Sequence, residues 1–211
     1  MQVTSTGCRV AVIGASGFVG SHVYSACQSY FGESGVIGTC FRGGDVTRHV
    51  QLDATDKTAV AQFVTGYKPQ AVVVCAGNKN IAACEASWDE ACAGNVAAVV
   101  NLLAALHEDV DLLVLSSDYV FSGTRGNYTD TQETSPVTNY GKSKALAEQL
   151  MRESGKGTAI RTSAVIGSGS VFWNWLSTSL VSKKPIEMFT DAYFSPTPIA
   201  LLSDLIIALL E

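Results

Sequence analysis

Short apolar runs rich in β-branched residues recur along the chain and alternate with longer stretches of helical spacing. The runs are continuous, as in "CRVAVIG" and "QAVVVCAG", which is typical of strands buried on both faces of a parallel sheet. They predict strands over 8–14, 35–41, 50–53, 70–77, 111–117 and 157–163. Apolar residues at helical spacing predict helices over 17–30, 56–66, 86–107, 140–154 and 170–182.

Strands that alternate with helices predict an α/β fold, with a Rossmann-type doubly wound parallel sheet flanked by helices. No internal repeat, low-complexity tract or long linker divides the chain, so residues 1–211 are expected to form a single domain. In this architecture ligands bind in the loops that follow the strands.

Composition narrows the class of protein further. With 47% hydrophobic and 16% charged residues, the chain can build one compact domain with a sizeable core. A net charge of -5 argues against nucleic acid as a partner, since phosphate binding needs a basic face. No apolar run reaches the roughly 18 residues that span a bilayer, and the N-terminus has no secretion-signal pattern. We therefore expect a cytoplasmic protein without a membrane partner.

The cysteines do not suggest a disulfide framework or a metal site. There are six of them, none in a C-x-x-C pair, and the three histidines lie far from them in the sequence. They are Cys8, Cys27, Cys40, Cys75, Cys84 and Cys92. Buried, reduced thiols are the expectation.

A glycine-rich turn follows the first predicted strand. Gly14, Gly17 and Gly20 form G-x-x-G-x-x-G, whose first gap is one residue longer than in the usual dinucleotide fingerprint. Gly14 permits a tight turn, Gly17 lets the backbone approach a pyrophosphate, and Gly20 lets the helix pack on the sheet. The N–H groups of residues 16–19 would face the anion at the helix N-terminus. The turn predicts dinucleotide binding; the alternative is a turn that serves packing alone.

The end of the second predicted strand bears on the choice between NADP and NAD. An acidic residue there binds the ribose hydroxyls of NAD, whereas an arginine suits the phosphate of NADP. Arg42 comes first in "TCFRGGD" and Asp45 only later, which favours NADP(H) over NAD(H). Asp53 could accept a hydrogen bond from the adenine amino group, or it could cap the following helix.

Several motifs together resemble the extended short-chain dehydrogenase/reductase family, in the dTDP-4-dehydrorhamnose reductase-like branch. They include "GASGFVGSH", "SSDYVFSG", "SPVTNYGKSKALAE", "IRTSAVIG" and "FSPTPIALLSDLI", and they run from residue 11 to about 206. The same branch contains the regulatory β subunit of methionine adenosyltransferase. The resemblance implies an NAD(P)-binding Rossmann domain over 1–211 and an NAD(P)-dependent oxidoreductase.

The resemblance also implies catalytic roles for three residues. Ser117 would hydrogen-bond the substrate carbonyl, and Tyr140 would protonate the alkoxide as a hydride arrives. A free phenol has a pKa near 10. Lys144, one helical turn further on, would lower that pKa and hold the nicotinamide ribose. Without the resemblance, the same spacing reads as a solvated helix start.

Other residues take family positions at the cofactor or the substrate. The cofactor set is Gly14, Ser16, Gly17, Phe18, Val19, Gly20, Arg42, Asp53, Ala54, Cys75, Ala76, Gly77, Asn95, Tyr140 and Lys144. The substrate set is Asn78, Ser117, Asp118 and Ser163. The helix asparagine Asn95 would shape the backbone near the site, and the "SPT" of 195–197 would edge it.

Two departures from the family pattern concern the substrate side. Ala164 in "RTSA" stands where deoxysugar reductases have a tryptophan, and members of the branch commonly approach three hundred residues. We therefore expect a reduced or missing C-terminal substrate subdomain, with about 164–211 as its remnant. An open site would call for a smaller substrate or a covering chain, most simply a symmetric homodimer partner.

Three functions remain in competition. The first is an NADP(H)-dependent reductase of a small-molecule carbonyl such as a 4-keto sugar, which the set Ser117, Tyr140 and Lys144 favours. The second is a cofactor-binding regulatory or scaffold protein like the methionine adenosyltransferase β subunit. The third is a nucleotide-sugar epimerase or dehydratase. "SSDYVF" supplies Asp118 but no following glutamate, which makes a dehydratase less favoured.

Overall fold

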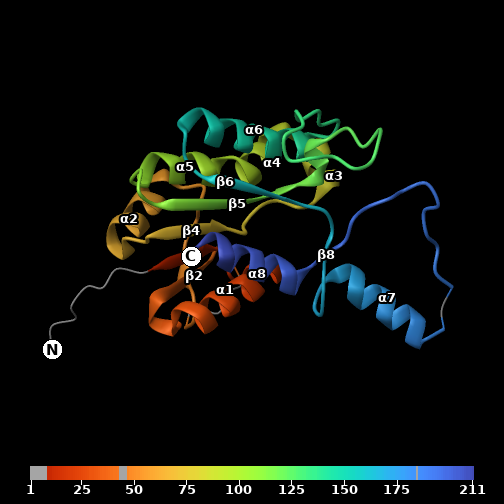
Figure 1. Ribbon diagram of the computed structural model, residues 1–211, viewed down its shortest axis with the longest axis horizontal. Helices are drawn as coiled ribbons and strands as arrows, with labels where there is room; N and C mark the ends of the chain where they lie inside the picture. Colours follow the sequence, from red (N-terminus) through yellow and green to blue (C-terminus); the bar gives the residue numbers. More distant parts are fainter. Residues whose placement is uncertain (1–8, 43–46, 184) are drawn as a thin grey trace.

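The computed structural model describes residues 9–42, 47–183 and 185–211. Within these residues six parallel strands form one sheet in the order β3-β2-β1-β4-β5-β6 (Figure 1). Their bounds are β1 Val10–Ile13, β2 Val36–Cys40, β3 Val50–Gln51, β4 Ala71–Val74, β5 Asp111–Ser117 and β6 Thr158–Thr162. The predicted doubly wound α/β class is confirmed. The strand order changes direction between β1 and β4, where ligands bind in folds of this type.

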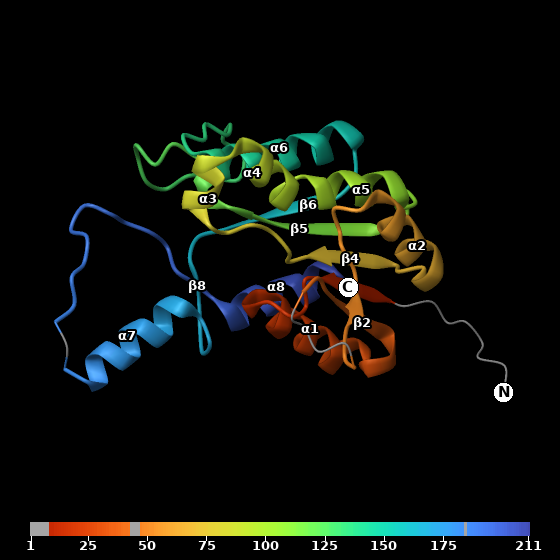
Figure 2. The same ribbon diagram turned by 180° about the vertical axis from the view of Figure 1, so that it is seen from behind.

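Helices cover both faces of the sheet, as the two opposite views show (Figures 1 and 2). Helices α1 (Phe18–Phe31) and α8 (Ile199–Leu209) lie together on one face. The other face carries α2 (Lys57–Tyr67), α3 (Ile81–Ala86), α4 (Trp88–Asn95), α5 (Ala97–Ala105) and α6 (Asn139–Ser154). Two apolar cores result, one beneath each layer.

Strand β1 shows why the apolar runs are continuous. Val10 and Val12 pack into the core beneath α1 and α8, whereas Ala11 and Ile13 pack into the core on the opposite face. All four side chains are at most 2% exposed. A strand buried on both faces has no position for a polar residue, so its pattern does not alternate.

The helix predicted over roughly 86–107 is not continuous: it is two helices, α4 and α5, which together run from 88 to 105. Ser87 has extended backbone angles and its hydroxyl accepts the Glu90 N–H at 3.2 Å, which ends α3 and begins α4. Val96, at φ -113°, separates α4 from α5. A serine inside an apolar periodic stretch can cap a helix as well as continue one, and periodicity alone does not separate the two cases.

The sequence pattern also missed α8 and a small two-stranded sheet. That sheet pairs β7 (Val165–Ile166) with β8 (Thr197–Pro198), strands of two residues each, too short to show a period. Helix α8 is apolar at most positions and so lacks a polar face, although only Ile199, Leu202, Ser203 and Ile206 are buried in it.

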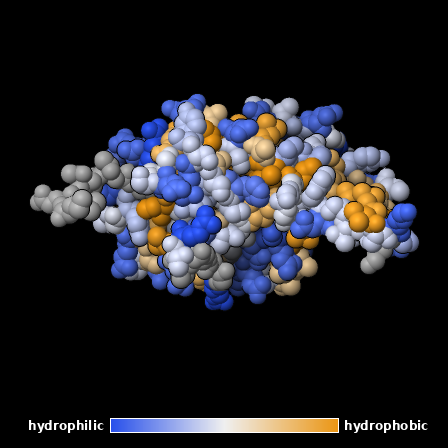
Figure 3. All heavy atoms as spheres, turned by 90° about the horizontal axis from the view of Figure 1, so that it is seen from below, coloured by the Kyte–Doolittle hydropathy of each residue, from blue (hydrophilic) through white to orange (hydrophobic). Residues whose placement is uncertain are grey.

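Helix α7 (Val171–Val181) confirms the helix predicted over 170–182, yet it stands away from the layers (Figures 1 and 2). None of its described residues is buried. Seen from below, apolar atoms are exposed at the end of the molecule where α7 lies (Figure 3). Val171 and Val181 are 80% and 85% exposed, which is unusual for apolar residues on a helix.

Candidate functional site

The glycine turn between β1 and α1 is tightly packed. Gly14 has φ 84°, and its N–H donates to the Thr39 hydroxyl at 3.2 Å. A Cβ on Gly14 would lie 2.9 Å from Ala76, and one on Gly20 would lie 2.0 Å from the Gly14 carbonyl oxygen. Side chains at these two positions would collide with backbone atoms, so the packing of the turn itself requires both glycines.

Gly17 differs from the other two glycines. A Cβ there would meet the Gly14 carbonyl oxygen at 3.5 Å, an ordinary contact, so packing within the chain does not require glycine. Gly17 begins α1 without a side-chain cap, and the first turn of the helix has no acidic residue. Exposed backbone with free space at a helix N-terminus fits a phosphate group. The turn therefore has the shape and the dipole that a dinucleotide needs.

A cleft of about 580 Å³ opens beside this turn, at the carboxyl ends of β4 and β5. It brings together predicted residues that are widely separated in the sequence, from the glycine turn to the segment after β6. Of the predicted site residues, Phe18, Val19, Cys75, Ala76, Gly77, Asn78, Asn95, Ser117, Tyr140, Lys144 and Ser163 line it. Lining residues that the sequence reasoning missed are Lys79, Asn80, Leu115, Ser116, Thr162, Val165, Gly169, Ser170, Val171 and Phe172.

Ser117 and Tyr140 meet at one wall of the cleft. Ser117 ends β5 and is 7% exposed; its hydroxyl donates to the Asp118 carboxylate at 3.1 Å. Tyr140 lies in the first turn of α6, with its ring edge-on to that of Tyr119 at 5.5 Å between centroids. Burial raises the pKa of the Tyr140 phenol, and a hydrogen bond with Ser117 opposes the rise. The phenol therefore keeps its proton at neutral pH.

Lys144 lies one turn further along α6 and is 8% exposed. Its ammonium group donates to the Leu115 carbonyl of β5 at 3.1 Å, and burial lowers its pKa to about 8. The predicted lowering of the Tyr140 pKa by Lys144 is not found in this structure: burial raises that pKa, and the group that opposes the rise is Ser117 rather than Lys144. The spacing places both groups at one cleft, but it does not reveal how deeply each is buried.

Asn95, at the end of α4, holds the loop after β4 against α6. Its side-chain amide donates to the Asn78 carbonyl at 3.1 Å and to the Ser143 hydroxyl at 3.0 Å. Its buried Oδ1 has no hydrogen-bond partner among the described groups. A Cβ on Gly77 would lie 2.9 Å from that oxygen and 3.2 Å from Lys144 Nζ. Gly77 thus lets two polar groups approach the loop backbone, which fits a polar ligand passing across it.

The residues predicted to bind the adenine half of the cofactor are exposed or half-buried. Arg42 is exposed, its guanidinium lies 4.6 Å from the centre of the Phe41 ring, and its charge helps to lower the pKa of Asp53. Hydrogen bonds from Thr55 contribute most to that lowering, from its hydroxyl at 2.6 Å and its N–H at 2.9 Å. Ala54 is half-buried beside Asp53.

The alternative role of Asp53 as a helix cap is wrong. The cap of α2 is Asp56, whose carboxylate accepts the N–H groups of Thr58 and Ala59. Asp45, which weighed in the cofactor prediction, lies outside the described residues, as does Cys8.

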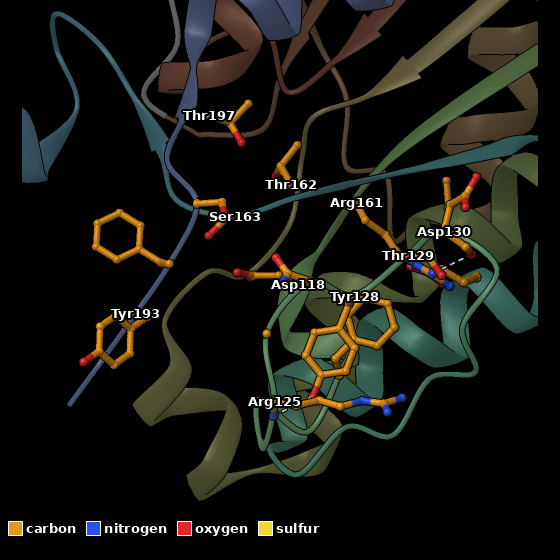
Figure 4. A pocket seen from close by; sticks show the side chains of 18 of the residues that line it. Asp118, Arg125, Tyr128, Thr129, Asp130, Arg161, Thr162, Ser163, Tyr193 and Thr197 are labelled. Carbon is orange, nitrogen blue, oxygen red and sulfur yellow. Dashed lines mark hydrogen bonds and ion pairs between the residues drawn. The ribbon is translucent and has the colours of Figure 1, made fainter.

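Figure 4 shows a second, larger cavity of about 1290 Å³. It shares Thr162 and Ser163 with the lining of the cleft. Asp118 lines it, as do Ser195 and Thr197 of the "SPT" loop. Ser16, the three glycines of the turn, Arg42, Asp53 and Ala54 line neither cavity.

A stack of rings and guanidinium groups forms one wall of the larger cavity (Figure 4). The Phe121 and Tyr128 rings stack at 4.3 Å, with Arg161 over Phe121 at 5.1 Å and Arg125 over Tyr128 at 6.0 Å. These four residues are spread over about forty positions, and no sequence motif linked them.

The comparisons with known proteins agree with the fold and identify the family. Residues 8–211 match the RmlD substrate binding domain, so the chain belongs to that family, within the extended short-chain dehydrogenase/reductase and epimerase superfamily. The resemblance inferred from the motifs is thereby confirmed.

Two relatives of the chain belong to different kinds of protein, a reductase and a subunit of another enzyme. The chain is 29% identical over 203 residues to Agl14 of Haloferax volcanii, a probable low-salt glycan biosynthesis reductase, and the match covers 88% of this chain and 65% of the relative. It is 33% identical over 153 residues to methionine adenosyltransferase 2 subunit beta of Rattus norvegicus, covering 72% of this chain and 45% of the relative. The chain thus spans less than two thirds of either relative.

Among solved structures, a hypothetical dTDP-4-dehydrorhamnose reductase from Sulfolobus tokodaii has a TM-score of 0.85 and 27% identity, over 96% of this chain and 72% of that one. The dTDP-4-dehydrorhamnose reductase of Bacillus anthracis, solved in complex with NADP, has a TM-score of 0.80 and 24% identity, over 97% of this chain and 71% of that one. At 24% identity, the similarity to the Bacillus anthracis structure is evidence for a shared fold alone.

The described residues include neither a membrane-spanning helix nor a cluster of metal ligands. In the described part of the chain, no helix combines the length and apolar character needed to cross a bilayer. Among the same residues, no three His, Cys, Asp or Glu side chains gather as ligands for a metal ion.

Proposed function

We propose that this chain is an NADP(H)-dependent reductase that reduces a small-molecule carbonyl, with 4-keto sugars, including nucleotide-linked ones, as the substrate class. The observation that carries the proposal is the meeting of Ser117, Tyr140 and Lys144 at one cleft beside the glycine turn. Membership of the RmlD family supports it, as does the reductase Agl14 among the relatives.

The chain's own residues divide the chemistry between them. Ser117 would hold the carbonyl oxygen by a hydrogen bond, and the Tyr140 phenol would give its proton to that oxygen as it becomes an alkoxide. The phenol is protonated at neutral pH, and the hydrogen bond with Ser117 opposes the rise in its pKa that burial causes, so a proton is available at this position. Lys144, with a pKa of about 8, keeps most of its positive charge there. A bound nicotinamide would supply the hydride.

The glycine turn would hold the dinucleotide phosphates, and Arg42 would favour NADP over NAD. Asp53, whose pKa the charge of Arg42 helps to lower, and its neighbour Ala54 would contact the adenine. Asn78 in the cleft, Asp118 in the larger cavity and Ser163, which lines both, would contact the substrate.

The test is consumption of NADPH, followed by its absorbance, with a panel of carbonyls that includes dTDP-4-keto sugars. Tyr140→Phe should lower kcat by about a hundredfold or more, because it deletes the proton donor, and should leave NADPH binding nearly intact. Tyr67→Phe, at an exposed tyrosine of α2, is the matched control and should retain full activity. Full turnover by Tyr140→Phe would overturn the assignment of the acid.

A regulatory protein that binds the cofactor without turning it over is the second candidate. The 33% identity to methionine adenosyltransferase 2 subunit beta favours it. Tight NADPH binding without oxidation of NADPH by any carbonyl of the panel would support this candidate over the reductase.

A nucleotide-sugar epimerase is the third candidate, and the common superfamily supports it. Such an enzyme interconverts sugar epimers without net consumption of the nicotinamide. Product analysis by NMR after incubation with NAD and a nucleotide sugar separates it from a reductase.

We further propose that the chain forms a symmetric homodimer through the side that carries α7. The exposure of Val171, Trp173, Trp175, Leu180 and Val181 supports this partner. An apolar surface of this kind is a common mark of a protein interface.

A further inference from the structure

Helix α6 contacts β5 through buried polar side chains next to the candidate site. Lys144 donates to the Leu115 carbonyl at 3.1 Å, and the Ser116 hydroxyl donates to Glu148 Oε1 at 2.5 Å. Lys144 and Glu148 are one helical turn apart, so they lie on the same face of α6. These two contacts join consecutive residues of β5 to consecutive turns of the helix.

Glu148 is held in one orientation. It is 5% exposed, and Arg161 donates to it from Nε, at 3.1 Å to each oxygen, and from Nη2, at 2.7 Å to Oε2. Arg161 Nη1 donates to the Asp130 carbonyl at 3.1 Å. A bidentate arginine pair fixes both oxygens of a carboxylate, and a buried carboxylate needs such a partner to remain charged.

We propose that Glu148 is a positioning residue for the candidate site, which keeps Lys144 in place and presents a fixed negative charge to it. The inference rests on the proposed function in so far as Lys144 serves the reaction there. It does not require Glu148 to touch substrate or cofactor.

The groups that face Lys144 from its neighbours support this role. Cys75 from the end of β4, Cys84 from α3 and Glu148 from α6 itself would each raise the pKa of Lys144 if negatively charged. Burial raises the pKa of Cys75 to about 12 and also raises that of Cys84, so both thiols are neutral near pH 7. Of these three groups, Glu148 therefore supplies the charge that acts against the desolvation of Lys144.

The charge state of Lys144 can be measured through the pH dependence of folding stability. Its pKa is about 8 in the folded chain and near 10.5 in the unfolded chain. Above pH 8 the unfolded chain binds the extra proton, so the free energy of unfolding rises with pH. Cys27 and Cys75, with pKa values raised to about 11 and about 12, have the opposite effect, as do Cys84 and Cys92, whose pKa values are also raised. Their effect begins near pH 8, where the unfolded thiols start to ionise, so the contribution of Lys144 is read as the difference from Lys144→Met, which keeps every cysteine.

The experiment measures unfolding by urea between pH 6 and 9 in the ligand-free protein. Glu148→Gln should move the onset of the rise to lower pH, because the charge that opposes the desolvation of Lys144 is lost. Lys144→Met should abolish the rise. Glu153→Gln, the same change at an exposed position of α6, should leave the onset where it is in the unaltered protein.

An unchanged onset in Glu148→Gln would overturn the inference. Should that variant fail to fold because Arg161 is stranded, the double variant Glu148→Gln/Arg161→Gln is compared with Arg161→Gln, so that loss of the carboxylate is again the only difference, and the onset should lie at lower pH in the double variant. The readout does not depend on activity. If the unaltered protein reduces no carbonyl, the proposed function fails, while the shift in onset still supports or overturns the role of Glu148.

Discussion

Arg42 is the single residue on which we expect the preference for NADP to depend. It is exposed at the end of β2, where a guanidinium can pair with the additional phosphate of NADP. We predict that Arg42→Ala weakens NADP binding by about tenfold or more and changes NAD binding little, as measured by calorimetry. Arg48→Ala, at another exposed arginine nearby, is the control. Equal affinities of the unaltered protein for the two cofactors would contradict the prediction.

Single residues also show where sequence reasoning reaches its limit. The four-residue spacing of Tyr140 and Lys144 correctly placed both at one cleft, because a helix fixes which residues share a face. Their pKa values could not be predicted in this way, because they depend on burial, which the tertiary contacts set. The pair Glu148–Arg161 was missed for a related reason: its partners come from α6 and β6 and lie thirteen residues apart without a local motif.

At the scale of elements, the turn between β1 and α1 depends on Gly20 for its packing. We predict that Gly20→Ala destabilises the fold by about 1–3 kcal/mol, because the new Cβ would lie 2.0 Å from the Gly14 carbonyl oxygen. Gly66→Ala in α2, where a Cβ meets nothing within 4 Å, should be neutral or stabilising by up to about 1 kcal/mol. Urea denaturation of both variants checks this, and equal stabilities would argue against close packing at Gly20.

Elements whose buried positions follow a regular pattern in the sequence were the most predictable. The buried strands produce continuous apolar runs, and α1, α2 and α6 show the spacing of helices with one buried face. Elements decided by tertiary context were not predictable. The pairing of β7 with β8 joins strands about thirty residues apart. The break between α4 and α5 at Val96 was missed for a different reason, since the apolar periodicity does not mark it. The same holds for the candidate site. Its glycine turn was predicted from the sequence, whereas the wall of the larger cavity formed by Phe121, Tyr128 and Arg161 was not.

At the scale of the whole molecule, the aromatic and aliphatic side chains near α7 lack a cover within the described chain. Tyr193 and Phe189, on the segment that follows α7, are 92% and 86% exposed, and Tyr193 lines the larger cavity (Figure 4). Burial of each large apolar side chain stabilises an interface by roughly 1.5–3 kcal/mol, so a partner that covers several of them gains substantially. A symmetric partner placed there would also enclose the cavity beside the candidate site.

We therefore predict a dimer in solution that depends on α7. Val181→Glu should convert it to a monomer, because a carboxylate at the most exposed aliphatic position of the helix would have to be desolvated in the interface. Val100→Glu, at an exposed valine of α5 on a different part of the surface, is the matched control and should remain dimeric. Sedimentation equilibrium of the three proteins gives their masses directly. A monomeric unaltered protein would exclude the dimer, whereas loss of the dimer in both variants would place the interface elsewhere or reflect a general effect of added charge.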